Sequence, residues 1–160
     1  IAIVPCSDSD RLCYKTALEI QYWWFNYANG VSKIYDSSEI LAENLGSKYN
    51  IVAIGCPQNN KYLDKIMDLI RPFRITEDFI EIRGSKYRSD ETGIAVVYPN
   101  PLSDYKRYIG ILGGCNRESI EAIHRLEFTL IPDYLVYRSR DVGRTLNGIL
   151  ETGFFDYWWT

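Results

Sequence analysis

The chain has 160 residues, of which 46% are hydrophobic and 24% charged, and this composition is typical of a single globular domain with a buried core. The net charge of −3 gives no electrostatic reason to expect a nucleic acid or an anionic membrane as partner. No apolar run approaches the ~20 residues that a membrane-spanning helix requires. The chain starts at Ile1 in a predicted strand, without Met, so we expect one domain, 1–160, that is processed from or part of a larger polypeptide.

Strands and helices alternate in the first half of the chain. Short apolar runs predict buried strands at 1–4, 31–35 and 50–54. Apolar residues at helical spacing, with Gly or Pro after them, predict helices at 11–29, 38–45 and 60–70. This order favours parallel strands joined by right-handed helical crossovers.

The predicted helix at 11–29 is apolar on two sides. One stripe contains Ala17, Ile20, Trp24 and Tyr27 or Ala28. The other contains Tyr14, Leu18, Tyr22 and Phe25. A helix of this kind is covered twice, so we expect it to lie between the sheet and a neighbour.

The second half of the chain predicts a different arrangement. Alternating residues at 79–82 and 86–88 flank a turn and predict a small hairpin. Further elements are expected as strands at 93–98, 108–112, 133–137 and 148–155, and as a helix at 116–128. A loop of moderate length joins 93–98 to 108–112, so these two strands should be antiparallel neighbours. The expected fold is a three-layered α/β domain with a mixed sheet of five to seven strands.

Two similar junctions, each a strand followed by glycine, cysteine and a helix, occur at 50–60 and 108–118. Their polar residues should lie at the carboxyl ends of strands, where open α/β sheets keep their ligand crevice. The candidate crevice residues are Asn59, Asn60, Gly114, Asn116 and Asp36. Neither junction has the glycine pattern of a dinucleotide site or a P-loop, so we favour tight turns over an anion site.

Several segments together resemble a known family. They are 50–57 with Asn59 and Asn60, Tyr98-Pro99-Asn100-Pro101-Leu102, Arg107-Tyr108 before the Gly113-Gly114 turn, Pro132-Asp133-Tyr134-Leu135-Val136, and Gly153-Phe154-Phe155-Asp156 with Trp158. Their order and spacing, over most of the chain from 31 to 159, are similar to the C-terminal accessory domain of secreted, mostly prokaryotic esterase- or peptidase-like proteins of the α/β-hydrolase class.

This resemblance implies an extracellular module and a flavodoxin-like layered fold, but no activity. We therefore expect a flavodoxin- or Rossmann-like three-layer sandwich with a mixed, largely parallel sheet and an added β-hairpin. The chain departs from the family at Cys56, where Gly-Gly-Pro is usual, and at Cys115, where a small residue is usual. It has no Gly-x-Ser-x-Gly elbow, so hydrolase chemistry is not carried over.

Four cysteines, Cys6, Cys13, Cys56 and Cys115, permit two disulfides in three connectivities. If the strands before Cys56 and Cys115 are neighbours, about 4.8 Å apart, their Cα atoms fall within disulfide range. Cys6 and Cys13 would then form the other bridge. In a secreted context we favour these structural disulfides. A second hypothesis makes Cys56 or Cys115 a nucleophile activated at a helix N-terminus, but His124 lies roughly 12–14 Å along the helix axis from Cys115.

We expect no catalytic residue, metal or cofactor, since the chain has one histidine and no Cys-x-x-Cys pair. Asp8, Asp10 and Asp36 are candidate ligands for a hard cation, but helix capping explains such residues as well and is favoured.

The chain contains 13 Tyr, 4 Trp and 6 Phe. In the pairs Trp23-Trp24 and Trp158-Trp159, adjacent side chains point different ways, so we expect one of each pair to be buried and the other to be available for docking.

We favour a non-catalytic accessory or interaction module of a secreted protein, extracellular or at the cell surface, that docks or self-assembles. Its partner would be a domain of the parent chain or an identical subunit, bound through aromatic or edge-strand contacts. The alternative is a small-ligand-binding or thiol-dependent hydrolase-like domain that uses the crevice. A polar pocket with a reactive group would favour the alternative, and an exposed aromatic patch would favour the module.

Overall fold

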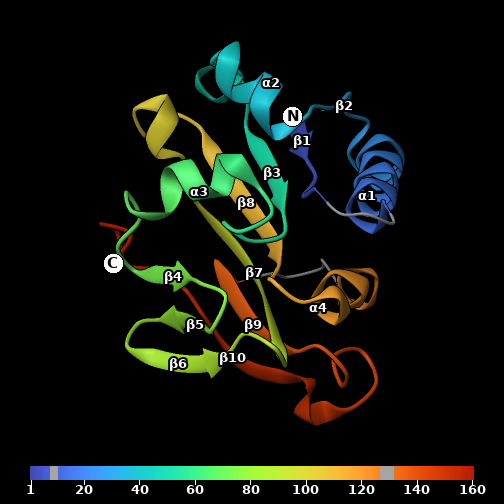
Figure 1. The fold of residues 1–160 in the computed structure, drawn as a ribbon, viewed down its shortest axis with the longest axis vertical. Coiled ribbons are helices and arrows are strands. Elements are labelled where there is room, and N and C mark those ends of the chain that lie inside the picture. The colour runs from blue at the N-terminus through green and yellow to red at the C-terminus, as the bar shows by residue number, and fades with distance from the viewer. Residues whose placement is uncertain (8–10, 127–131) are drawn as a thin grey trace.

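A seven-stranded mixed sheet forms the centre of the computed structural model, which describes residues 1–7, 11–126 and 132–160 (Figure 1). Its strand order is β10-β9-β7-β8-β3-β1-β2. The strands are β1 (Ala2–Val4), β2 (Lys33–Ile34), β3 (Ile51–Ile54), β7 (Thr92–Pro99), β8 (Tyr108–Gly113), β9 (Tyr134–Arg138) and β10 (Ile149–Gly153). The predicted α/β class with a mixed sheet is confirmed. Asp8 and Asp10, which we expected to be capping residues, lie outside the described residues.

The sheet changes character between its two halves. Strands β2, β1, β3 and β8 pair in parallel, as the alternating first half of the sequence predicts. Strands β7, β9 and β10 are antiparallel to their neighbours, and the prediction that β7 and β8 pair in this way is confirmed. The expectation of a largely parallel sheet is wrong, because most of the paired length is antiparallel. The second half lacks the helical crossover after β7 that a parallel arrangement requires.

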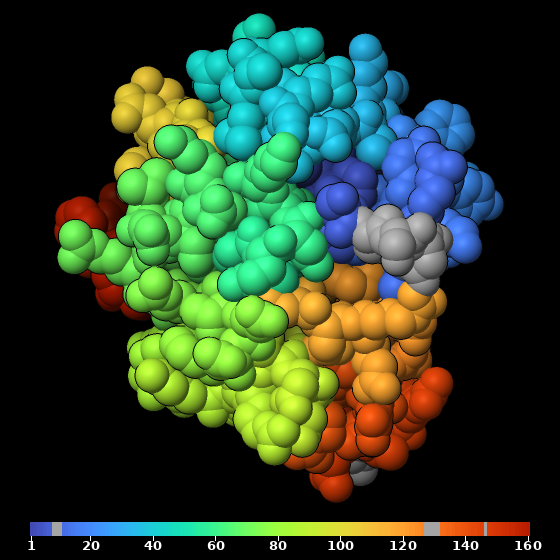
Figure 2. Space-filling model, in the orientation of Figure 1, coloured from blue at the N-terminus to red at the C-terminus, as the bar shows by residue number. Residues whose placement is uncertain are grey.

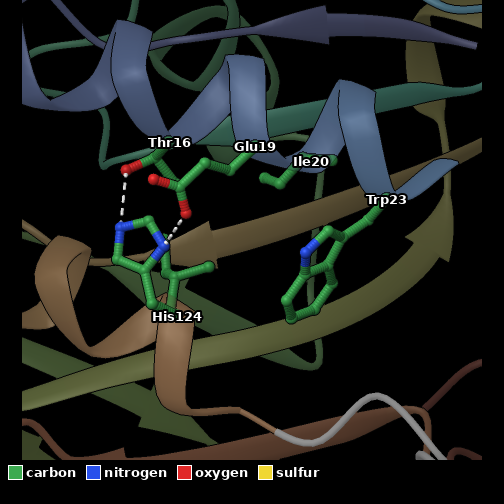
Figure 3. Close-up of a pocket in the computed structure, with 6 residues that line it drawn as sticks. Thr16, Glu19, Ile20, Trp23 and His124 are labelled. Atoms are coloured by element: carbon green, nitrogen blue, oxygen red, sulfur yellow. Dashed lines mark hydrogen bonds and ion pairs between the residues drawn. The ribbon is translucent and has the colours of Figure 1, made fainter. Parts of the chain in front are cut away.

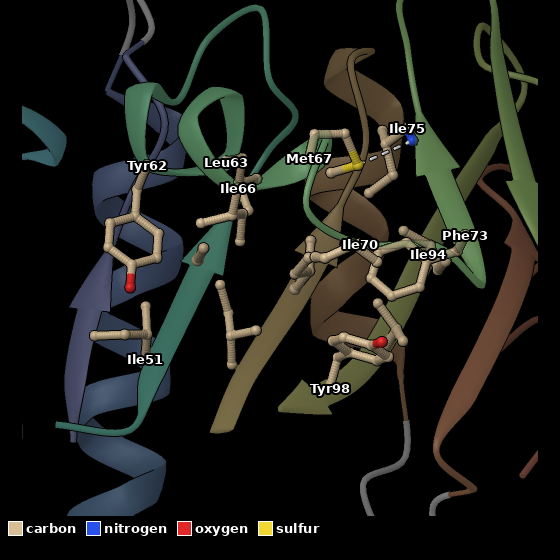
Figure 4. Packing of buried hydrophobic residues seen from close by; sticks show 14 of the residues in the cluster. Ile51, Tyr62, Leu63, Ile66, Met67, Ile70, Phe73, Ile75, Ile94 and Tyr98 are labelled. Atoms are coloured by element: carbon tan, nitrogen blue, oxygen red, sulfur yellow. Dashed lines mark hydrogen bonds between the residues drawn. The ribbon is translucent and has the colours of Figure 1, made fainter. Parts of the chain in front are cut away.

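Helices lie on both faces of this sheet. We call one side the closed face, because α2 (Ser37–Ala42) and α3 (Lys61–Met67) pack over it with the large core cluster that Figure 4 shows. On the other side, which we call the open face, α1 (Leu12–Ala28) and α4 (Arg117–Ala122) pack over a second cluster. Short 3₁₀ helices connect other elements: η1 (Leu45–Ser47), η2 (Pro101–Ser103), η3 (Ile123–Arg125) and η4 (Leu146–Gly148).

A separate three-stranded antiparallel sheet completes the closed face. It consists of β4 (Phe73–Ile75), β5 (Phe79–Ile82) and β6 (Ser85–Arg88), in that order. The predicted hairpin corresponds to β5 and β6, while β4 was not predicted. The apolar residues of β4 and β5 belong to the closed-face core. In Figure 2 the segments that run from α2 to the small sheet, in cyan to yellow-green, cover the left and centre of the face shown.

Several helices are shorter than their sequence patterns predict. The helix expected at 60–70 ends at Met67, and the helix expected at 116–128 ends at Ala122, where η3 follows. Residues 127 and 128 of that prediction lie outside the described residues. Helix α1 has nearly the predicted range of 11–29. It ends where predicted because Asn29 adopts the left-handed conformation with φ 50° and donates its backbone N–H to Trp24 O.

Candidate functional site

The two glycine junctions meet at one edge of the sheet. Ile54 and Leu112 are partners in the pairing of β3 with β8, and Gly55 and Gly113 follow them with φ of 104° and 102°. Such positive φ values favour glycine, so both glycines serve as tight turns before their helices.

The described cysteines are all paired in disulfides. Cys56 and Cys115 bridge the two junctions, with their Cα atoms 5.1 Å apart. Cys6 and Cys13 tie the end of β1 to the first turn of α1, with a Cα separation of 5.5 Å. Both predicted bridges are present, and the described chain holds no free thiol to serve as a nucleophile.

The asparagines of the candidate crevice are engaged within the fold. Asn60 is fully buried and accepts from the backbone N–H groups of Tyr62 and Leu63. Its amide nitrogen donates to Val4 O and Ile54 O, at 3.0 Å in each case. Asn60 therefore caps α3 and joins two strand ends, so its amide group is already occupied by structural bonds.

The other asparagines have similar structural roles. Asn59 accepts from the backbone N–H of Cys56 at 2.9 Å. Asn116 caps α4 by accepting from the backbone N–H of Ser119, and its amide nitrogen donates to Ser89 O and Thr92 O. These amides of Asn59 and Asn116 thus make bonds that hold the junction itself together.

The two remaining candidates also lie in tight or capping positions. Gly114 packs so closely that a Cβ atom there would lie 3.0 Å from Ser119 Oγ and 3.1 Å from Thr92 O. Asp36 caps α2 by accepting from the backbone N–H of Ser38 at 2.7 Å, as capping predicts. It follows β2, two strands away from the bridged junctions, so the structure does not bring it into the same group.

The described residues contain no group of three or more His, Cys, Asp or Glu side chains placed to hold a metal ion. Within the same residues, no helix is both long enough and apolar enough to span a membrane.

A different feature dominates the open face. The N-terminal half of α1 is anchored there, with Cys13, Thr16 and Ala17 buried against the sheet and α4. Glu19 pairs with His124 Nδ1 at 2.5 Å, on the turn that follows α4 (Figure 3). Thr16 lies 3.5 Å from the other ring nitrogen of this histidine.

Every residue from 22 to 28, in the C-terminal half of α1, is exposed. The outward stripe consists of Tyr14, Leu18, Tyr22 and Phe25, which we call the ridge. Tyr22 and Phe25 are 66% and 65% exposed. The expectation that a neighbour covers this second stripe is not met by any described part of the chain. A helix with apolar residues on all sides is normally buried, so this surface requires explanation.

An apolar hollow of about 710 Å³ lies between α1 and the open face of the sheet, and we call it the trough. Its floor includes Val52, Gly110 and Val97, which lie in register across β3, β8 and β7. Val97 is 41% exposed although β7 is an interior strand. The α1 wall is formed by Ile20, Trp23, Trp24 and Tyr27.

Two glycines shape this trough. A Cβ atom at Gly30 would collide with the indole of Trp24, so this glycine lets the ring lie against the backbone. At Gly110, in contrast, an added Cβ atom would meet its nearest neighbours at ordinary distances of 3.9 and 4.0 Å. The missing side chain at Gly110 therefore deepens the floor. Sequence reasoning missed the floor residues, and the only signal for them was a glycine within an apolar strand.

The tryptophan pairs differ from each other. Trp23 and Trp24 are both 38% exposed, so the expectation of one buried member is wrong here. Trp158 is exposed, while Trp159 is half-buried and packs 5.8 Å from Tyr98 and 6.0 Å from Phe155 between ring centroids. The second pair follows the expected alternation more closely.

No family model, curated protein or solved structure matches this chain.

Proposed function

We propose that this chain is a non-catalytic accessory module of a secreted protein, which docks through the exposed aromatic surface formed by α1 and the trough. The observation that carries this proposal is the apolar surface at Val97 and Gly110, on an interior part of the sheet, which the described residues leave partly exposed. Sheets with parallel strands are usually covered on both faces, and large exposed apolar patches mark interaction sites.

Other features support parts of this proposal. Two disulfides suit an extracellular or cell-surface location. The strand order β2-β1-β3-β8 agrees with the first four strands of a flavodoxin-like sheet, which suits the resemblance to accessory domains of secreted α/β-hydrolase-class proteins. In this proposal the partner is a domain of the parent chain or an identical subunit.

The crevice at the bridged junctions does not favour the alternative function. Its cysteines are paired, and the amides of Asn60 and Asn116 are engaged with the backbone. A ligand would have to displace bonds that hold the strand ends together, which costs about 1–3 kcal/mol for each buried group left unpaired.

A hydrophobic fluorescent dye, bis-ANS, tests the docking surface at low protein concentration. We expect the wild-type chain to bind the dye and Gly110→Val, which fills the floor, to bind it several-fold more weakly. Tyr105→Ser is the matched control, because Tyr105 is an exposed aromatic residue outside the trough. Equal dye binding by the wild type and Gly110→Val would contradict the proposal.

Peptide mapping of the non-reduced, alkylated protein tests the oxidised state. The expected products are the peptide pairs that contain Cys6 with Cys13 and Cys56 with Cys115. Rapid alkylation of Cys56 or Cys115 at neutral pH would instead support thiol chemistry at the crevice.

A further inference from the structure

We propose that β10 is the contact edge of a two-fold dimer, in which it pairs in antiparallel fashion with β10 of a second copy of this chain. This surface includes neither the ridge nor the trough, so the inference goes beyond the proposed docking function and does not depend on it. It follows from the free backbone edge of β10, from the lack of protection along this edge, and from the symmetry of its side chains.

Strand β10 forms one edge of the main sheet. It pairs with β9 on one side, and within the described residues no backbone hydrogen bond joins 149–153 to any other strand. An edge strand directs about half of its backbone N–H and C=O groups away from its neighbour. Strand β10 therefore presents donors and acceptors along five residues, and another strand can satisfy them.

The other three sheet edges differ from β10, because each is short or exposes a basic side chain. Strand β2 has only two residues, and β4 has three, with exposed Arg74 in the middle. Strand β6 exposes Lys86 and Arg88. Short length and charged side chains are the usual means by which an edge avoids pairing with another chain. These three edges are therefore protected in ways that β10 is not.

The one charged residue of β10 does not protect its edge. Glu151 accepts hydrogen bonds from the hydroxyl groups of Tyr134, at 3.1 Å, and Tyr87, at 2.5 Å. It lies opposite Val136, a residue of the closed-face core, so these bonds hold its carboxylate on the closed face. The strand contains no lysine and no proline, which are typical of protected edges.

The open-face side chains of β10 are arranged symmetrically about Thr152. In the pairing with β9, the partners of Ile149 and Thr152 both pack in or against the open-face cluster. Leu150 is an extra residue at a register shift, so Ile149 lies only two places before Thr152 when counted along β9. Phe154 lies two places after Thr152, and the alternation of side chains directs it to the same face. Ile149 and Phe154 are 53% and 68% exposed.

An antiparallel pair centred on Thr152 matches these side chains. Thr152 then lies opposite Thr152 of the second copy, and Ile149 lies opposite Phe154 on both sides of the axis. Thr–Thr pairs and pairs of an aromatic with a β-branched residue are favourable across strands. On the closed face Glu151 lies opposite Gly153, so no like charges meet. An identical strand supplies this match, because a two-fold axis brings the same surface of both copies together.

Sedimentation equilibrium over a wide range of protein concentration tests this inference. We expect a dimer with a dissociation constant in the micromolar range. Thr152→Lys should weaken the dimer about tenfold or more, because it places two positive charges side by side at the axis. Thr152→Glu should do the same with two negative charges. The matched control is Tyr105→Lys, which adds the same charge at an exposed residue between η2 and β8 and should leave the dimer unchanged.

Mixing the two charge variants gives the sharper result. In a mixed dimer the lysine introduced in one copy lies opposite the glutamate introduced in the other. We therefore expect the mixed dimer to be about tenfold tighter than the dimer of either variant alone. A mixed dimer no tighter than these would overturn the two-fold pairing at Thr152. A wild-type chain that stays monomeric at the highest concentration, or a dimer that Thr152→Lys leaves intact, would overturn the inference altogether.

The failure of this inference can be distinguished from the failure of the proposed function, because no residue of β10 lines the described trough. A monomer that binds bis-ANS in a manner sensitive to Gly110→Val overturns the β10 dimer and leaves the docking surface. A dimer sensitive to Thr152→Lys, in a chain whose dye binding ignores Gly110→Val, supports the β10 dimer and overturns the docking surface. Circular dichroism and thermal unfolding of each variant establish that a weaker dimer does not reflect a lost fold.

Discussion

The two faces of the main sheet differ in how completely they are covered. On the closed face, α2, α3 and the small sheet bury a continuous core that includes Tyr62, Phe73 and Ile80. On the open face, α4 and the first half of α1 do the same, but the second half of α1 lies over the trough, which the described residues do not fill. One face is therefore fully packed, while the described residues leave part of the apolar surface on the other face exposed. Substitutions of the same type on the two faces should have different consequences.

The largest contrast should come from two phenylalanines. Phe73 is 1% exposed and packs between Tyr98 and Phe155, with ring centroids 5.7 and 6.4 Å away. Phe73→Ala should lower the free energy of unfolding by about 3–5 kcal/mol, because it leaves a cavity. Phe25→Ala, on the ridge, should change the free energy of unfolding of the dilute monomer by no more than about 0.5 kcal/mol.

Urea unfolding at low protein concentration measures both values. If Phe25→Ala lowers the free energy of unfolding as much as Phe73→Ala does, the ridge is part of the folded core. The two faces of the sheet would then not differ in how completely they are covered.

The disulfide that closes the longer loop should contribute more to the free energy of unfolding than the one that closes the shorter loop. Cys56 and Cys115 are 59 residues apart, while Cys6 and Cys13 are only 7 apart. In the chain-entropy model, replacing the long-range pair by serine should cost about 4 kcal/mol, and replacing the short-range pair about 2–3 kcal/mol. Chemical unfolding of the two double variants gives the comparison. A larger loss from the short-range pair would mean that its attachment of α1 matters more than loop closure.

On the open face, the residues under α4 are buried, so substitutions there should lower the free energy of unfolding, as they do on the closed face. Tyr137 is fully buried there and donates its hydroxyl hydrogen bond to Ser119 O at 2.9 Å. Burial raises the pKa of Tyr137, so the phenol ionises more readily in the unfolded chain. The unfolded state then binds fewer protons, so the free energy of unfolding should fall as the pH rises above about 10.

Tyr137→Phe isolates this effect. The variant should lose about 1 kcal/mol at neutral pH with the hydrogen bond, but its free energy of unfolding should decline less steeply above about pH 10. The measurement is urea unfolding of both proteins at neutral and alkaline pH. Identical alkaline slopes would show that Tyr137 is not the group responsible.

The smallest effect on stability should come from the trough floor. Glycine in a strand interior is unfavourable, and a Cβ atom at Gly110 meets no close neighbour. Gly110→Val should therefore raise the free energy of unfolding by a few tenths to about 1 kcal/mol. Thermal unfolding of the dilute protein gives this value. Destabilisation would mean that the floor is already packed, and the trough would then not be an open surface.

The sequence predicts the parallel half of the fold well. Alternating apolar runs and helix signals locate β1, β3, β8 and α1, and the strand ends predict the Cys56–Cys115 bridge. It does not predict the antiparallel half as well, because strand direction there depends on long-range pairing of β9 and β10 rather than on local pattern.

The candidate site shows a similar limit. Asn59, Asn60 and Asn116 follow strands in the pattern of a ligand crevice, yet the same pattern serves helix capping, and only the structure shows where each amide bonds. The two apolar stripes of α1 are visible in the sequence. That the outer stripe stays exposed is not, because exposure depends on what the rest of the chain covers.

Tryptophan fluorescence tests the central claim most directly, since Trp23 and Trp24 line the trough. Replacing Trp158 and Trp159 by phenylalanine leaves these two indoles as the only reporters. Their partial exposure predicts strong quenching by acrylamide in the dilute protein, and Gly110→Val, which adds a side chain to the floor of the same trough, should weaken this quenching. Weak quenching in the dilute monomer, unchanged by Gly110→Val, would contradict the account, because the open face would then already be covered.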